Sequence, residues 1–183
     1  IETMLQEGGK TQPHPELPKP EITLLPDVNG EKIASKVTRA NFFSSKEFVV
    51  FRASQPLKSV SSAVNNAGMG WYRTFVNRHV DSAYNCDDVK SEMAAYLETK
   101  GFPLTETVAM MTAVTTEHVE IGEYEGDFGK VFIAVTAGIG NAVDVSQAIS
   151  RDETPKVGTI NTWVIINGPL PDEAFIQAMI TAT

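Results

Sequence analysis

The chain has 183 residues, of which 42% are apolar and 21% charged, and its formal net charge is −8. This composition is typical of a globular protein and excludes a disordered, collagen-like or coiled-coil chain. Because proteins that bind nucleic acids or anionic membranes usually present a basic face, the negative charge argues against DNA, RNA and lipid as partners. The length suits one domain that folds without a disulfide or a metal.

Cysteine usage and hydropathy both indicate a reducing, cytoplasmic compartment. Cys86 is the single cysteine, which excludes an internal disulfide framework and a cysteine-rich zinc site. The longest apolar run, residues 131–139, is far shorter than the roughly 18 residues that cross a bilayer. No secretory signal stands at the start. We therefore expect a cytoplasmic protein.

The first part of the chain is predicted to be a tail followed by strands. Four prolines punctuate the polar residues 1–20, so we expect a flexible tail there and the domain over residues 21–183. Residues 48–51 are apolar on both alternating faces, which predicts a covered central strand. Residues 65–70, rich in Asn and Gly, are predicted to form a tight loop. Further strands are predicted at residues 21–25, 33–39, 57–64 and 74–80.

The clearest helix is predicted over residues 88–100. Asp88, or Asp87 before it, can cap the N-terminus. Met93 and Leu97 continue an apolar stripe that begins at residue 89 and recurs every four residues. Gly101 suits the C′ position, and a proline two residues later prevents continuation.

The second half alternates strands with turns. Strands are predicted at residues 108–114, 116–121, 131–136 and 157–166, a turn at 125–129, a Gly-rich loop at 137–141 and a short helix at 142–149. A last helix is predicted to begin at Pro171. It meets no stop signal before Thr183, so we expect the protein to continue. Strands without intervening helices predominate, which predicts an α+β single domain with a largely antiparallel or mixed sheet flanked by a few helices.

Taken one at a time, the polar residues give weak signals of chemistry. His14, His79 and His118 lie far apart in the sequence and do not have zinc-ligand spacing. His79, at a strand end, is interpreted as structural in preference to a general base. Cys86 is interpreted as a small buried side chain. Residues 138–141 could present backbone N–H groups to an anion or an oxyanion, or could be an ordinary tight turn with a helix cap.

Considered together, the polar residues form five ordered motifs. Val60-Ser61-Ser62-Ala63 with Gly68-Met69-Gly70 is followed by Asn77 with Val80, by Met111-Thr112-Ala113, by Thr136-Ala137-Gly138 with Gly140-Asn141-Ala142, and by Gly158-Thr159-Ile160-Asn161. Their order and approximate spacing resemble the adenosylcobinamide amidohydrolase family across about residues 57–183.

The resemblance implies a hydrolase of corrinoid salvage. Members of the family cleave the amide that joins aminopropanol to the corrin ring of adenosylcobinamide, which gives adenosylcobyric acid for coenzyme B12 synthesis. The cobalt corrinoid is then the small-molecule substrate, and no resident cofactor or metal is expected. The family continues with a Thr-Glu-Ala-Lys motif, of which Thr181-Ala182-Thr183 matches only the approach. We therefore expect the domain to lack a C-terminal segment that supplies one or two carboxylates.

Amide hydrolysis needs an activated water or nucleophile, a proton donor for the amine and donors to the oxyanion. Asn141 and the N–H groups of residues 138–141 are predicted to serve the oxyanion, Thr136 and Thr112 to donate hydroxyl hydrogens, and Asn77 and Asp88 to orient substrate or water. The predicted substrate-binding residues are Ser61, Ser62, Asn65, Gly68, Gly70, Trp71, Gly138, Gly140, Thr159 and Asn161, with Trp71 against the corrin ring or the adenosyl group.

Two other functions remain open at this stage. A corrinoid-binding module without catalysis, serving uptake or delivery, would retain the same motifs. An unrelated amidase could use the same scaffold on another secondary amide.

Overall fold

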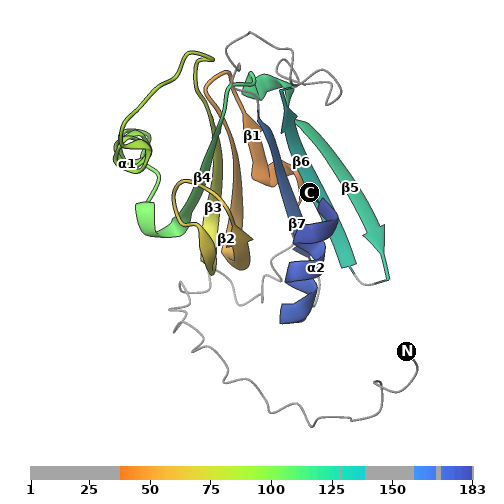
Figure 1. Ribbon diagram of the computed structural model, residues 1–183. Coiled ribbons are helices and arrows are strands. Elements are labelled where there is room, and N and C mark those ends of the chain that lie inside the picture. The colour runs from red at the N-terminus through yellow and green to blue at the C-terminus, as the bar shows by residue number, and fades with distance from the viewer. Residues whose placement is uncertain (1–37, 128, 139–158, 168–169, 183) are drawn as a thin grey trace, which may run out of the picture. The chain divides into compact units, whose positions relative to one another are not determined.

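The computed structural model describes residues 38–127, 129–138, 159–167 and 170–182 (Figure 1). The strands are β1 (Phe42–Ser44), β2 (Phe48–Ser61), β3 (Gly68–His79), β4 (Thr107–Thr112), β5 (Glu120–Gly126), β6 (Gly129–Ala137) and β7 (Ile160–Asn167). The helices are α1 (Val89–Thr99) and α2 (Asp172–Ala182), with 3-10 turns at Arg39–Asn41, Leu104–Glu106 and Thr116–His118. The predicted tail, the strand at residues 21–25 and the helix at 142–149 lie outside the described residues.

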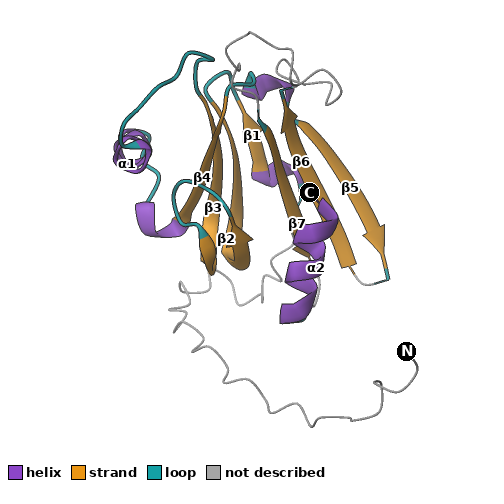
Figure 2. Ribbon diagram, viewed as in Figure 1, coloured by secondary structure: helices purple, strands orange, loops and turns teal. Residues whose placement is uncertain are grey.

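The strands form two sheets, coloured orange in Figure 2. One has the order β1-β2-β3-β4, with β3 and β4 parallel and α1 in the connection between them. The other has the order β5-β6-β7 and is antiparallel throughout. This arrangement confirms the predicted α+β class with largely antiparallel strands, and it divides those strands between two sheets.

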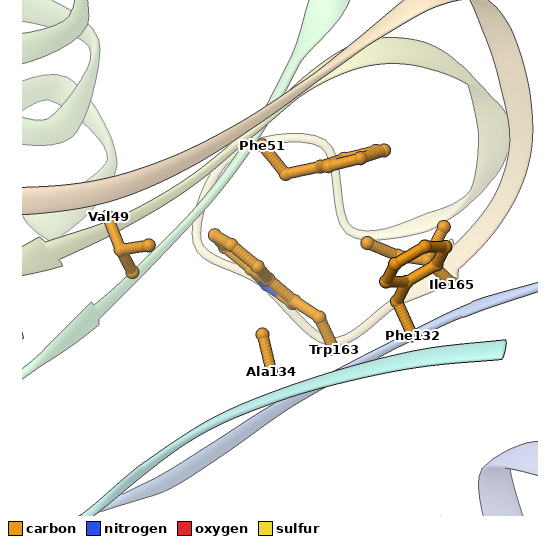
Figure 3. Packing of buried hydrophobic residues seen from close by; sticks show 6 residues of the cluster. All are labelled: Val49, Phe51, Phe132, Ala134, Trp163 and Ile165. Carbon is orange, nitrogen blue, oxygen red and sulfur yellow. The ribbon is translucent and has the colours of Figure 1, made fainter. Parts of the chain in front are cut away.

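The two sheets pack face to face through a buried apolar cluster. Phe51 from β2 meets Phe132 from β6 and Trp163 from β7, and each of these side chains is at least nine-tenths buried. Figure 3 shows them pointing toward one another from their two sheets, together with Val49, Ala134 and Ile165. Burial of such large side chains stabilises the contact between the sheets more than any other type of interaction in this interface.

The opposite face of the first sheet is covered by α1. Val50 and Val76 on this face pack against Met93 and Leu97, which are fully buried. The first sheet is therefore covered on both faces. This explains why residues 48–51 are continuously apolar, and it confirms the central strand predicted there.

The ends of α1 follow the sequence signals closely. The Asp88 carboxylate accepts a hydrogen bond from the Ser91 N–H at 3.1 Å, as an N-cap does. Gly101 has φ +71°, and the N–H of Phe102 donates to the Leu97 carbonyl at 2.9 Å. This is the C-terminal arrangement in which glycine is favoured, because its left-handed conformation strains other residues.

Two predictions about the strands on either side of residues 62–67 are wrong. Residues 48–51 and 57–64 are not two strands, because β2 runs from Phe48 to Ser61 with a shift in register between Arg52 and Leu57. Gly68 and Gly70 do not belong to a loop, because they begin β3 and pair with Ser61 and Ser59. Pairing along this long ladder offsets the low strand propensity of glycine.

The strand predicted at residues 116–121 begins only at Glu120. Thr116–His118 is a 3-10 turn, in which the buried Thr116 hydroxyl donates to the Ser45 carbonyl at 2.6 Å. This hydrogen bond holds the Thr116 side chain inward. In the predicted half-exposed strand, the hydroxyl would not make the same hydrogen bond. The strand predicted at 33–39 is described only at its end, where Arg39 begins a 3-10 turn.

Phe132→Ala is expected to lower the free energy of unfolding by about 3–5 kcal/mol, because it removes a fully buried ring from between the two sheets. The neighbouring substitution Ile133→Ala is the matched control, since Ile133 is 43% exposed on the other face of β6. Urea unfolding of both variants measures the difference, and equal losses would contradict the importance of the packing between the sheets.

Candidate functional site

The facing surfaces of the two sheets change from apolar to polar toward one end. On β3, alternate residues Phe75, Asn77 and His79 share the face that looks toward the second sheet. On β4, their register partners are Val108, Met110 and Thr112. The polar members of both series therefore lie together, at the ends of two neighbouring parallel strands.

The second sheet shows the same change. Inward-facing Phe132 and Ala134 on β6 are followed by Thr136, whose register partner on β7 is Asn161. Polar ends of the two sheets thus face each other, and their side chains are close enough to bond directly. We call Asn77, Thr112, Thr136, Thr159 and Asn161 the polar cluster.

The centre of the polar cluster is a chain of side-chain hydrogen bonds. The Asn77 Nδ2 donates to Thr136 Oγ1 at 2.8 Å, and the Asn161 Nδ2 donates to Asn77 Oδ1 at 2.8 Å. Asn161 Nδ2 also donates to the Met111 carbonyl at 2.8 Å. Asn77 is 2% exposed and Thr136 1%. Because the amide of Asn77 is bonded at both its nitrogen and its oxygen, its burial leaves neither group unpaired.

A second chain of bonds runs beside the first. The Thr159 hydroxyl donates to Thr112 Oγ1 at 3.0 Å, and the Gly138 N–H donates to the Thr159 carbonyl at 3.0 Å. The Val80 N–H donates to the Thr112 carbonyl at 2.8 Å. The structure therefore brings together residues from four of the five sequence motifs, those that begin at Asn77, Met111, Thr136 and Gly158.

His79, for which the sequence favours a structural role over that of a general base, lies next to this cluster. Its Nδ1 is 2.9 Å from the Val114 carbonyl oxygen, which can only accept a hydrogen bond. Nδ1 therefore holds the ring hydrogen, and in the neutral ring Nε2 has a free lone pair. The side chain is half-buried and is paired with Thr112 in the strand register. Its place two residues after Asn77 on a strand was the sequence signal that could have identified it.

Asp88, another predicted catalytic residue, caps α1 and is fully exposed. Hydrogen bonds from the Ser91 hydroxyl and then from the Ser91 N–H lower the pKa of its carboxyl group. Within the described part of the chain, no hydrogen bond joins Asp88 to the polar cluster.

An ion pair holds the connection from β3 to α1, on the face of β3 that points away from the second sheet. Arg78 bonds Glu92 at 2.6 Å, and this bond lowers the pKa of the Glu92 carboxyl. The Tyr84 hydroxyl also donates to Glu92, at 3.0 Å. Burial and this hydrogen bond raise the pKa of Tyr84 to about 12. The end of β3 is therefore fixed from both faces.

The predicted substrate-binding residues fall into two groups. Thr159, Asn161 and Gly138 lie in or against the polar cluster. Ser61 and Gly68 pair at the other end of β3 from Asn77. Asn65, three residues before Gly68, nevertheless pairs with Ala109 on β4, which is one residue from the register partner of Asn77. The two groups are therefore distinct, but they lie near each other.

A cavity of about 240 Å³ lies between these two groups. Ser61 at the end of β2 and Ser62 after it line the cavity, and Met110 and Trp163 line it where it approaches the polar cluster. Helix α2 covers it, beside β7 in Figure 1. The cavity therefore borders both groups of predicted residues.

The remaining predicted binding residues occupy other positions. Asn65 Nδ2 donates to the Thr107 carbonyl at 2.7 Å and fastens its loop to β4. At Gly70 a side chain would overlap the ring of Tyr72, so a substitution there would displace that ring. Trp71 is 44% exposed and does not line the cavity. Their part in substrate binding stays a prediction.

One detail of the predicted oxyanion site is wrong. The Gly138 N–H is already donated to the Thr159 carbonyl, so it is not available to an oxyanion. Gly140 and Asn141 lie outside the described residues, and their predicted roles are untested. Among the residues that the structure does describe, no group of three or more His, Cys, Asp or Glu side chains is arranged to hold a metal ion, and no helix is long and apolar enough to cross a membrane.

Comparison with known proteins identifies the family. The family model described as adenosylcobinamide amidohydrolase matches residues 32–183. The chain belongs to this family. The matched residues include the polar cluster, His79 and the residues that line the cavity. These features are therefore part of the family's domain.

A curated relative is the Bacillus subtilis (strain 168) protein named uncharacterized ABC transporter ATP-binding protein YvrA. It is 26% identical over 169 residues, which are 92% of this chain and 33% of the relative. The chain thus spans about a third of the length of that relative. No solved structure matches the chain.

Asn161→Ala is expected to lower the free energy of unfolding by about 1–3 kcal/mol, because it leaves the Asn77 amide oxygen and the Met111 carbonyl without their donor. Asn167→Ala, at the other end of β7, is the control and should have a smaller effect. Chemical denaturation measures both. A loss in Asn161→Ala no greater than in the control would contradict the role of the bonds between the sheets.

Proposed function

We propose that this protein hydrolyses the amide that joins aminopropanol to the corrin ring of adenosylcobinamide. The products are aminopropanol and adenosylcobyric acid, which returns to cobalamin synthesis. We propose that it acts in the cytoplasm, with the cobalt corrinoid as substrate and without a resident cofactor. The observation that supports this best is the meeting of four family motifs at one end of the two sheets, beside a histidine with a defined tautomer.

His79 is the proposed general base. Its Nε2 takes a proton from a water molecule as the water oxygen attacks the carbonyl carbon of the amide. The imidazolium that forms keeps its Nδ1–H on the Val114 carbonyl, which orients the ring and stabilises the positive charge. When the C–N bond breaks, the same Nε2 gives its proton to the departing nitrogen, and aminopropanol leaves as a neutral amine.

The polar cluster has a positioning role in this proposal. Asn77, Thr112 and Thr136 are at most 2% exposed, and their polar atoms bond to partners within the cluster. They fix the ends of β3, β4 and β6, and with them the backbone that holds His79. Asn141, three residues after Gly138 in the sequence, remains the predicted donor to the oxyanion.

His79→Asn is expected to lower the turnover of adenosylcobinamide by about 10²–10⁴-fold, because it removes the base. The asparagine amide can still donate to the Val114 carbonyl, so the fold is expected to remain. Release of aminopropanol and of cobyric acid measures turnover, and corrinoid absorbance measures binding.

The matched control is His118→Asn, which makes the same change at an exposed position of the 3-10 turn Thr116–His118. It should keep wild-type turnover. Full turnover by a folded His79→Asn variant would contradict the proposed base. No release by the unsubstituted protein, under conditions in which it binds the corrinoid, would contradict the hydrolase itself.

A second candidate function is corrinoid binding without catalysis, in uptake or delivery. The similarity to a protein named as an ABC transporter ATP-binding protein favours it, because such transporters move their substrates across membranes. The same assay separates the two functions. A shift in corrinoid absorbance without any release of aminopropanol would support the binding module.

A further inference from the structure

The cavity beneath α2 has walls that suit a flat aromatic group. Phe75 and Met110 line it from the first sheet, Trp163 from the second, and Phe175 and Met179 from α2. Aromatic rings and thioether sulfurs favour contact with the face or edge of another ring. The cavity is therefore more selective for a flat ring than a cavity lined by aliphatic side chains would be.

The charge at the cavity is already neutralised. Lys58, the basic residue in its lining, forms an ion pair with Asp172 at the start of α2. Its ammonium group also lies 5.4 Å from the centre of the Phe175 ring. Because this charge is paired, the cavity favours a neutral occupant over an anionic one. The same two contacts fasten α2 over the opening.

Size and polar groups narrow the choice further. Sites for drug-sized ligands usually measure about 300–1,000 Å³, so 240 Å³ accommodates one ring system and not a whole macrocycle. The hydroxyl residues Ser59, Ser61, Ser62 and Thr162 line the cavity. The Ser59 hydroxyl already donates to the Leu57 carbonyl but can still accept, and Ser61 Oγ accepts from the Ala63 N–H but can still donate. The favoured occupant is thus a neutral aromatic ring with hydrogen-bonding atoms at its edge.

We propose that the cavity binds the adenine ring of the substrate's adenosyl group, an inference that rests on the proposed substrate. The corrin macrocycle is too large for the cavity. Aminopropanol and the amide side chains are small and polar, and they gain little from aromatic walls. Adenine is flat and neutral, and its edge nitrogens match the hydroxyl groups. Met110 and Trp163 also border the polar cluster, so a substrate anchored here has its remainder next to that cluster.

Ala178→Phe tests the proposal, because Ala178 lines the cavity from α2 and a ring in its place would fill it. Affinity for adenosylcobinamide is expected to fall about tenfold or more, as the loss of one stacked base predicts. Affinity for dicyanocobinamide, which lacks the adenosyl group, should remain unchanged. The matched control is Gln177→Phe, which places the same ring on the exposed side of α2 and should alter neither affinity. Equal losses for both corrinoids, or no loss for either, would overturn the proposal.

A second measurement does not need hydrolysis. The chain has two tryptophans, so Trp71→Phe leaves Trp163, in the cavity wall, as the single fluorescent one. Adenosine should quench its emission, and Phe175→Leu, which keeps an apolar side chain but removes a ring, should weaken that quenching. An absence of quenching would overturn the adenine site even if aminopropanol is released. Quenching without release would keep the adenine site and contradict the hydrolase.

Discussion

The hydrogen bonds between Asn77, Thr136 and Asn161 are the interaction on which the rest of this structure depends. Apolar packing holds the two sheets together over most of their facing area, but such packing tolerates small shifts of one sheet over the other. Amide groups that bond at both ends do not, because a shift leaves buried donors and acceptors unpaired. The polar cluster therefore fixes how the sheets are aligned, whereas Phe51, Phe132 and Trp163 supply most of the stabilisation.

The position of the cavity follows from that alignment. β4 and β7 are each an edge strand of their sheet, and they meet at the polar cluster through Asn161 and the Met111 carbonyl. Farther along, Val108 on β4 and Ile165 on β7 line the cavity. Helix α2 fills part of this space, with Phe175 and Met179 toward the cavity. A site for an aromatic group thus arises where two edge strands separate and a helix covers the opening.

Local signals in the sequence predicted local structure well. The cap at Asp88, the stripe of Met93 and Leu97 and the glycine at position 101 all act within a few residues, and the structure confirms them. The glycines at 68 and 70 misled the prediction, because their strand is stabilised by pairing with residues on another strand. Strand propensity is a property of one residue. Hydrogen-bonded pairing between strands depends on partner residues whose positions the sequence does not reveal.

The candidate site likewise has features that the sequence predicted and features that it could not predict. The motif residues Asn77, Thr112, Thr136, Thr159 and Asn161 were predicted from the sequence, and the structure brings them together. Their mutual bonding and burial could not be predicted, since these depend on how two sheets face each other. The hydrogen bond of His79 could not be predicted for the same reason, because its acceptor, the Val114 carbonyl, lies 35 residues away in the sequence and fixes the ring hydrogen on Nδ1.

The placement of the predicted residues around the cavity bears on the choice among functions. Ser61 and Ser62 line the cavity, Asn77 lies in the polar cluster, and Met110 borders both. A small secondary amide bound at the polar cluster would leave the aromatic cavity beside it unused. A corrinoid has both a bulky ring system and a distant amide, and its adenosyl group is a third, separate part. The distribution of polar and aromatic residues therefore favours a large substrate that is held at one place and cleaved at another, over an amidase for small substrates.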